Sequence, residues 1–171
     1  MASIARTFIA AKPAAFRMAA TPVARSSFRT FTTTRMSLLR KYTKDHEWID
    51  LSADKKSAVV GISDYASHQL GDVVYVELPE DRIGEIIQKG DAIGAVESVK
   101  SASDINAPVR LKLIAVNKLL DEKPSIINQV PEDDSHGGGW IAKVELDEDG
   151  AKQAEELMDT EAYKAYTEAE D

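Results

Sequence analysis

The sequence predicts a mostly β domain, a compact β-sandwich or flattened barrel with a short helix near each end. Most of the chain after residue 40 consists of short runs rich in Val, Ile, Leu and Tyr. Polar turns separate these runs, as they do in antiparallel sheets. Helical caps or helical spacing mark only short segments, so helices can cover a sheet here but cannot form a core alone.

The first elements are expected to be a β-hairpin followed by a helix. Residues 46–51, HEWIDL, and 57–62, SAVVGI, are apolar runs, and the polar stretch SADKK between them favours a turn. Residues 63–71 begin with Ser-Asp, either of which can cap a helix, and end with Gly71, which can stop it. Residues 72–79, DVVYVELP, then predict a strand that the proline ends.

The middle of the chain predicts a loop and three further strands. The loop, residues 80–91, has turn chemistry at its glycines. Strands are expected at residues 92–99, 103–109 and 110–116, with a turn at Lys100-Ser101 between the first two.

The C-terminal part predicts one strand among short helices. Residues 117–123 favour a helical turn. Residues 140–146 alternate, with apolar side chains on one face and Lys143 and Glu145 on the other, which is typical of a half-buried strand. The last segment has apolar residues at helical spacing, and the expected inner face is Ala154, Leu157, Met158, Ala162 and Tyr166.

The charge of the chain is unevenly divided. The 171 residues carry a formal net charge of −8. Nine of the 21 basic residues and none of the 29 acids lie in residues 1–44, which leaves −17 on residues 45–171. Such an acidic body repels nucleic acid and anionic lipid and favours soluble partners with basic docking surfaces. No apolar run reaches the ~18 residues of a membrane-spanning helix. We therefore expect neither nucleic acid nor a membrane as a partner.

The N-terminal arm has the composition of a mitochondrial transit peptide. Residues 1–38 are rich in Arg, Ser, Thr and Ala and contain no acid. This is typical of segments that direct import and are then removed, so we expect the mature protein in the mitochondrial matrix. Cleavage is expected between about Phe31 and Leu39, at a bond that the sequence does not decide. A disordered basic tail is the alternative.

Composition and spacing give no sign of a catalytic centre. The chain contains no cysteine, which excludes disulfides, a thiolate nucleophile and a Cys-ligated metal site. Its histidines, His46, His68 and His136, lack the spacing of a metal site. No acid–base pair or nucleophile constellation is legible, so we predict that the protein is not an enzyme.

Lys100 lies in the turn between two predicted strands. A tight turn normally has Gly, Asn or Asp at its centre, whereas this one has Val99-Lys100-Ser101. Glu97 and Ser98 precede it, and small residues follow, so the amine is sterically uncrowded. On these residues alone, Lys100 is either a solvated surface charge, which is the commoner case, or a handle for a modifying enzyme.

Five motifs share their order and spacing with a known family over nearly the whole chain after Lys41. They are YTKDHEWI (42–49), VGISDYASHQLGDVVYVELPE (60–80), KGDAIGAVESVK (89–100), GWIAKV (139–144) and DTEAYKAY (159–166). They resemble the H proteins of the glycine cleavage system. The resemblance implies a flattened hybrid barrel of the lipoyl-domain type, with the β domain over residues 39–146 and a C-terminal helical cap over residues 147–171.

The resemblance also implies a covalent cofactor, lipoate, in amide linkage to Lys100. The rest of the implied attachment segment is Glu97, Ser98, Val99, Ser101 and Asp104. In the family, the lipoyl arm carries the aminomethyl group of glycine from a pyridoxal-phosphate-dependent glycine decarboxylase (P protein) to an aminomethyltransferase (T protein). Dihydrolipoamide dehydrogenase (L protein) reoxidises the arm, and a lipoyl or octanoyl transferase or ligase loads the lysine. An arm of about a dozen bonds reaches ~15 Å from the Cα atom, which is enough to enter a partner's active site.

Two acids are candidate contacts of this arm. The resemblance places Glu47 and Asp104 near its resting path, where an acidic groove would hold the amine of the loaded arm. The alternative is that Glu47 faces solvent beside a buried Trp48.

One position departs from the family pattern. Where the family has SPVSGEV, this chain has APVRLKL, so Leu111 replaces a turn glycine and Lys112 replaces an acid. If that position requires φ > 0, leucine costs about 1 kcal/mol or more. Otherwise the turn is built differently.

Two other functions stay open beside the glycine-cleavage carrier. One is a relay that hands lipoate or octanoate to other lipoate-dependent enzymes. The other is an unmodified adaptor in which Lys100 is merely solvated. Biotin carriers are disfavoured, because their lysine usually lies between methionines and Lys100 does not.

Overall fold

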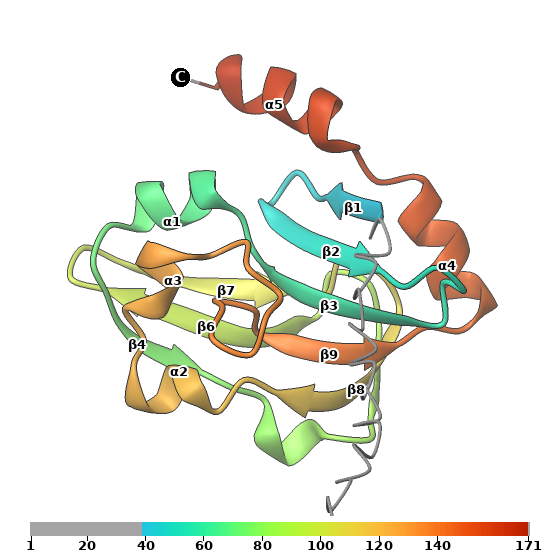
Figure 1. Cartoon of the computed structure of the whole chain (residues 1–171), viewed down its shortest axis with the longest axis horizontal. Coiled ribbons are helices and arrows are strands. Elements are labelled where there is room, and N and C mark those ends of the chain that lie inside the picture. Colours follow the sequence, from blue (N-terminus) through green and yellow to red (C-terminus); the bar gives the residue numbers. More distant parts are fainter. Residues whose placement is uncertain (1–38, 171) are drawn as a thin grey trace, which may run out of the picture. The chain divides into compact units, whose positions relative to one another are not determined.

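The computed structural model describes residues 39–170, which form two antiparallel sheets with short helices around them (Figure 1). The six-stranded sheet has the order β1-β2-β3-β9-β8-β5, and the three-stranded sheet has the order β4-β6-β7. The strands are β1 (Leu39–Tyr42), β2 (Glu47–Leu51), β3 (Ser57–Ile62), β4 (Val73–Glu77), β5 (Ile86–Ile87), β6 (Ala92–Ser98), β7 (Ala102–Asn106), β8 (Leu111–Val116) and β9 (Ala142–Glu145). The helices are α1 (Asp64–Leu70), the 3-10 helix η1 (Glu80–Arg82), α2 (Leu119–Glu122), α3 (Ile126–Gln129), α4 (Glu148–Glu155) and α5 (Thr160–Glu168).

The mostly β architecture expected from the sequence is confirmed. The expected transit peptide, residues 1–38, lies outside the described residues. Within residues 39–170, no helix has the length and apolar character needed to cross a bilayer.

One hydrophobic core joins the two sheets. Ile49 and Val60 of the larger sheet and Ile93 and Ile105 of the smaller sheet are fully buried and belong to the same cluster. Successive side chains of a strand point to opposite faces, so alternate residues reach this core. Full burial of each such side chain stabilises the fold by about 1.5–3 kcal/mol. The two sheets are therefore held together firmly, and the turns that connect their strands start from fixed positions.

The first hairpin and α1 form where the sequence predicts them. Strands β2 and β3 pair antiparallel. The Ser63 hydroxyl caps α1 by accepting a hydrogen bond from the Ala66 N–H at 3.1 Å. Gly71 ends the helix at φ 78°, a conformation that residues with a Cβ atom avoid. Helix α1 therefore stops abruptly and leads directly into β4.

Helices α4 and α5 confirm the helical C-terminus, and Leu157, Met158 and Tyr166 of the expected inner face pack partly buried against the core clusters. Ala154 is buried as expected, whereas Ala162 is exposed and Tyr163 is buried instead. Tyr163 stacks on Tyr42 of β1, with ring centroids 4.2 Å apart. The helical spacing restarts at the Asp159 cap of α5, and this restart places Tyr163 on the inner face.

Four short elements are absent from the sequence prediction. They are β1, η1, β5 and α3, none longer than 4 residues. Elements this short leave no periodic signature. Strand β9 is also shorter than the expected strand 140–146, although Lys143 and Glu145 do lie on its exposed face.

Leu111 is an ordinary strand residue. It opens β8 opposite Ile87 of β5, with 2% of its surface exposed. Among the non-glycine residues of 39–170, only His46 and Lys55 have a positive φ. The turn before β8 is thus built without a left-handed residue at position 111, and the leucine side chain joins the core.

Candidate functional site

The tip of the β6–β7 hairpin presents Lys100 to solvent. Ser98 builds this tip, because its hydroxyl oxygen accepts hydrogen bonds from the N–H groups of Lys100 and Ser101, both at 3.1 Å. The Ser98 hydroxyl and N–H also donate to the Ser101 carbonyl, at 3.1 and 2.8 Å. A serine side chain therefore supplies the local bonds that turns usually obtain from Asn or Asp. Lys100 occupies the tip without a positive φ.

The link between α1 and β4 supports the tip from one side. The Val99 N–H donates to the Asp72 carbonyl at 3.1 Å. The stem of Lys100 lies over Gly71, because a Cβ atom added at Gly71 would be 2.9 Å from the Lys100 Cε. The φ of Gly71 favours glycine at this position, and the flexible stem of Lys100 lies directly above it.

The other residues of the attachment segment point in different directions. Ser98 forms the turn, and Val99 is 68% exposed beside it. Glu97 is exposed and pairs with Tyr75 of β4. Ser101 and Asp104 line a groove next to β7. The structure therefore brings only part of the segment to one surface.

We call this hollow the α1–β7 groove; its volume is about 240 Å³. Its main lining residues are Glu47, Ile62, Ala66, Leu70, Ser103 and Asp104. Leu70 directly precedes Gly71, on which the Lys100 stem rests, so the groove begins close to the lysine. Apolar side chains form one part of its wall, and the carboxylates of Glu47 and Asp104 form another.

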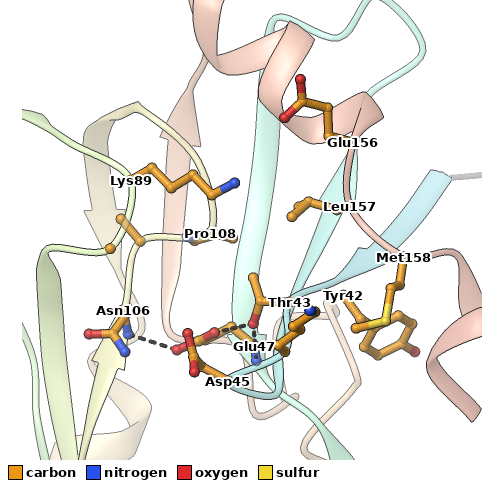
Figure 2. A pocket seen from close by; sticks show the side chains of 13 residues that line it. Tyr42, Thr43, Asp45, Glu47, Lys89, Asn106, Pro108, Glu156, Leu157 and Met158 are labelled. Carbon is orange, nitrogen blue, oxygen red and sulfur yellow. Dashed lines mark hydrogen bonds between the residues drawn. The ribbon is translucent and has the colours of Figure 1, made fainter. Parts of the chain in front are cut away.

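Glu47 is a buried carboxylate in this groove, with only 2% of its surface exposed. The Asn106 N–H donates to one carboxylate oxygen at 3.0 Å, and the Thr43 hydroxyl donates to the other (Figure 2). Burial raises the pKa of Glu47, while the hydrogen bonds from Thr43 and Asn106 oppose this shift. The alternative in which Glu47 faces solvent is wrong.

A second cavity, of about 310 Å³, also reaches Glu47. Figure 2 shows Glu47 on one side of it and Lys89 and Leu157 on the other. Glu47 therefore lines two hollows, one on each side of a nearly buried side chain.

His46 borders the α1–β7 groove and is held by α5. Its Nδ1 atom lies 2.9 Å from the Tyr163 hydroxyl, and its Nε2 atom lies 3.4 Å from the Glu170 carboxylate. His46 has φ 70°, a left-handed conformation that is uncommon for residues other than glycine but that histidine adopts more often than most. Sequence reasoning missed this role of α5, since His46 and Tyr163 are 117 positions apart.

The geometry of the site suits the attachment of a chain to Lys100 and its binding in the groove better than it suits catalysis. The described part of the chain contains no group of three or more His, Cys, Asp or Glu side chains that could hold a metal ion. It offers an uncrowded amine, an apolar groove wall close to that amine, and a buried carboxylate in the groove. An apolar chain attached to Lys100 fits this arrangement, and a cationic or hydrogen-bonding end of that chain would meet Glu47.

Comparison with known proteins gives a consistent result. Residues 40–170 match the family described as Glycine cleavage H-protein. The chain is 44% identical to the glycine cleavage system H protein of Thermotoga maritima, over 75% of this chain and 95% of that protein. It is 47% identical to the mitochondrial glycine cleavage system H protein 2 of Arabidopsis thaliana, over 77% of this chain and 78% of that one. A crystal structure of a glycine cleavage system H protein from Mycobacterium marinum aligns with a TM-score of 0.65 and 35% identity, covering 76% of this chain and 97% of that chain.

Proposed function

The chain belongs to the glycine cleavage H-protein family, and on that premise we propose that Lys100 carries lipoate in amide linkage. H proteins are lipoyl carriers and not enzymes, so the function of this chain is to carry a group between catalysts. The observation that carries the proposal is the position of Lys100, at an exposed hairpin tip within ESVKSASD and beside the α1–β7 groove.

The residues at the site fit a lipoyl group. Bound lipoate supplies a reducible disulfide on which a one-carbon amine is carried. Ala66 and Leu70 offer an apolar wall for its hydrocarbon chain. Glu47, fixed by Thr43 and Asn106, offers a carboxylate to the amine of the loaded arm. The groove also keeps part of the arm out of water, which protects the bond between carbon and sulfur.

Asp104 is the second proposed contact of the arm. It lines the groove from β7, and its carboxylate is exposed. An exposed carboxylate is screened by solvent, so its attraction for an amine is weaker than that of Glu47. Glu47 is therefore the main acidic contact, and Asp104 assists entry.

The partners follow from the carried group. Glycine decarboxylase supplies the aminomethyl group, an aminomethyltransferase accepts it, and dihydrolipoamide dehydrogenase reoxidises the arm. A lipoyl or octanoyl transferase or ligase loads Lys100. The charge of −17 on residues 45–171 favours basic docking surfaces on these enzymes.

We place the mature protein in the mitochondrial matrix. Support comes from the acid-free, Arg-rich composition of residues 1–38 and from the mitochondrial relative in Arabidopsis. N-terminal sequencing of the protein from isolated mitochondria tests this placement, and an N-terminus within about residues 31–39 is the expected result. Absence of the protein from the isolated mitochondria would contradict the placement, and a mitochondrial protein that retains residue 1 would contradict the expected cleavage.

The attachment site is tested with Lys100→Arg and the matched control Lys89→Arg. Both keep the charge, and both lysines are exposed. The intact mass of protein from its native compartment should show a lipoyl or octanoyl increment in the parent and in Lys89→Arg, but none in Lys100→Arg. Glycine cleavage in the reconstituted system should likewise stop only in Lys100→Arg. An unmodified parent would favour the adaptor function, and a modified Lys100→Arg would place the cofactor elsewhere.

A further inference from the structure

The link between α1 and β4, Gly71 and Asp72, and the first residue of β4, Val73, are bonded to two different elements of the fold. On one side, the Asp72 carbonyl accepts the Val99 N–H of the lysine-bearing tip at 3.1 Å. The groups that flank this carbonyl along the chain, the Gly71 carbonyl and the Val73 N–H, are bonded to a different element.

That different element is α3, and the residue is Asn128. Its Oδ1 atom accepts the Val73 N–H at 2.9 Å, and its Nδ2 atom donates to the Gly71 carbonyl at 2.8 Å. The same Nδ2 lies 3.4 Å from the Ser67 hydroxyl of α1. One side-chain amide thus bridges the backbone on the two sides of Asp72.

Helix α3 is itself firmly anchored. Ile126 and Ile127 are buried in the core, and the Ile127 carbonyl accepts the Ser67 hydroxyl at 3.0 Å. Asn128 therefore ties the link to the anchored helix α3, and the Asp72 carbonyl of the link in turn holds the Val99 N–H. The lysine next to Val99 also rests with its stem on Gly71, so both supports of Lys100 are held by the same amide.

We propose that Asn128 is a positioning residue that fixes the direction in which Lys100 leaves the hairpin tip. This inference rests on the proposed attachment of lipoate to Lys100 and extends it to a residue 28 positions away in sequence. The side chain must both accept and donate, which asparagine does and aspartate cannot do when ionised. Without it, the link and the tip can shift together while the core stays intact.

Asn128→Asp and Asn128→Ala test the proposal in the full chain. Asparagine and aspartate have nearly the same shape, but the aspartate oxygen would face the Gly71 carbonyl. Asn117→Asp is the matched control, because the Asn117 Nδ2 also donates to two backbone carbonyls, those of Gly138 and Trp140, at 2.9 and 2.8 Å. Asn117 has no contact with the link or the tip among its hydrogen bonds.

Two measurements are made on each folded variant. The first is the steady-state attachment of lipoate by a lipoate ligase with ATP. The KM for the carrier should rise about fivefold in both Asn128 variants with kcat unchanged, since a smaller fraction of molecules presents Lys100 correctly. The second is amide hydrogen exchange. Protection of the Val99 N–H should fall about fivefold, while protection of the buried Leu146 N–H, which bonds to the Lys56 carbonyl at 2.9 Å, stays at the parental level.

Asn117→Asp should leave both readouts unchanged. Parental KM and parental Val99 exchange in a folded Asn128 variant would overturn the proposal. An equal rise of KM in Asn117→Asp would overturn it too, because the effect would then be general loosening. Lys100→Arg in the same ligase assay separates the two claims: continued attachment there refutes Lys100 as the site, whereas Val99 exchange still reports whether Asn128 holds the tip.

Discussion

Replacing Glu47 by glutamine should separate the stability of the fold from the protection of the loaded arm. The two side chains have the same shape, so the α1–β7 groove keeps its form. The change removes a charge that is 2% exposed and leaves the hydrogen-bond acceptor for the Asn106 N–H. We expect little loss of stability in the empty protein and a clear loss of protection in the loaded one.

The effect on stability has a defined dependence on pH. Burial raises the pKa of Glu47 above its ordinary 4.5. Because the pKa is raised in the folded state, the protonated Glu47 side chain stabilises the fold relative to the ionised one. This contribution to the free energy of unfolding is fully present below pH 4.5 and is lost as the pH rises through the folded pKa. Glutamine does not titrate. As the pH rises from 4.5 through the folded pKa of Glu47, the free energy of unfolding of the variant should therefore increase relative to that of the parent. The bond lost from Thr43 costs about 1 kcal/mol and acts in the opposite direction, so the two proteins should differ by about 1 kcal/mol or less at pH 7.

The effect on the loaded arm is larger. A hydrogen bond between an ammonium and a carboxylate contributes about 1.5–3 kcal/mol, which corresponds to roughly a 10- to 150-fold change in how often the arm occupies the groove. The loaded protein should release formaldehyde and ammonia by hydrolysis faster by about tenfold or more. The assay loads the arm with its decarboxylase, removes the enzyme and follows formaldehyde with time. Glu97→Gln is the control, since it removes an exposed carboxylate from the same hairpin outside the groove.

If the loaded arm of Glu47→Gln is hydrolysed at the parental rate, Glu47 does not contact the arm's amine. Equal acceleration in Glu97→Gln would attribute the effect to the general charge of the hairpin. A loss of several kcal/mol in the empty protein would show that the ionised carboxylate stabilises the fold, contrary to its raised pKa.

Three further changes probe the surroundings of the site. Gly71→Ala should cost about 1 kcal/mol or more in urea unfolding, because φ is 78° there, and should slow lipoate attachment because the new Cβ meets the Lys100 stem. Tyr163 has its pKa raised from 10 to about 12 by burial, so unfolding experiments should show stability falling as the pH rises from 10 to 12, and Tyr163→Phe should reduce that fall. Glu132→Gln should cost about 1 kcal/mol in chemical denaturation, because the carboxylate pairs with Arg40 at 3.0 Å in a partly buried position; an unchanged midpoint would contradict this.

The sequence predicts the elements whose signals are local. The Ser63 cap and the Gly71 stop of α1 are both seen, because each acts on the backbone within its own helix. The β2–β3 hairpin and the alternation of Lys143 and Glu145 follow in the same way from the period of two. Lys100 is also found at the tip, since a turn between two strands places it there irrespective of the rest of the fold.

Long-range contacts account for most of what the sequence leaves undecided. The burial of Glu47 depends on Thr43 and Asn106, and Asn106 lies 59 positions away. The inner face of α5 depends on where Tyr163 meets Tyr42 of β1, a strand too short to predict. At Leu111 the sequence suggests strain that the structure does not contain. The departure from the family motif raises the question of a leucine with positive φ, but Leu111 is a regular strand residue and the turn is built without it. Local propensity cannot predict which side chains are buried at these positions, because tertiary packing determines the energy of each arrangement.

The environment of Glu47 bears on when the arm is held in the groove. Among residues 39–170, no cationic side chain forms an ion pair with Glu47, and the nearby charge of Asp45 raises its pKa further. A buried carboxylate without a cation is costly, and such groups concentrate where function requires them. If the arm's amine is the missing cation, only a loaded arm completes the pair, and an empty arm gains just the apolar contacts of the groove. The groove would then bind its cargo more tightly than its carrier chain, so that a loaded arm stays shielded between enzymes and an unloaded one is released for reoxidation.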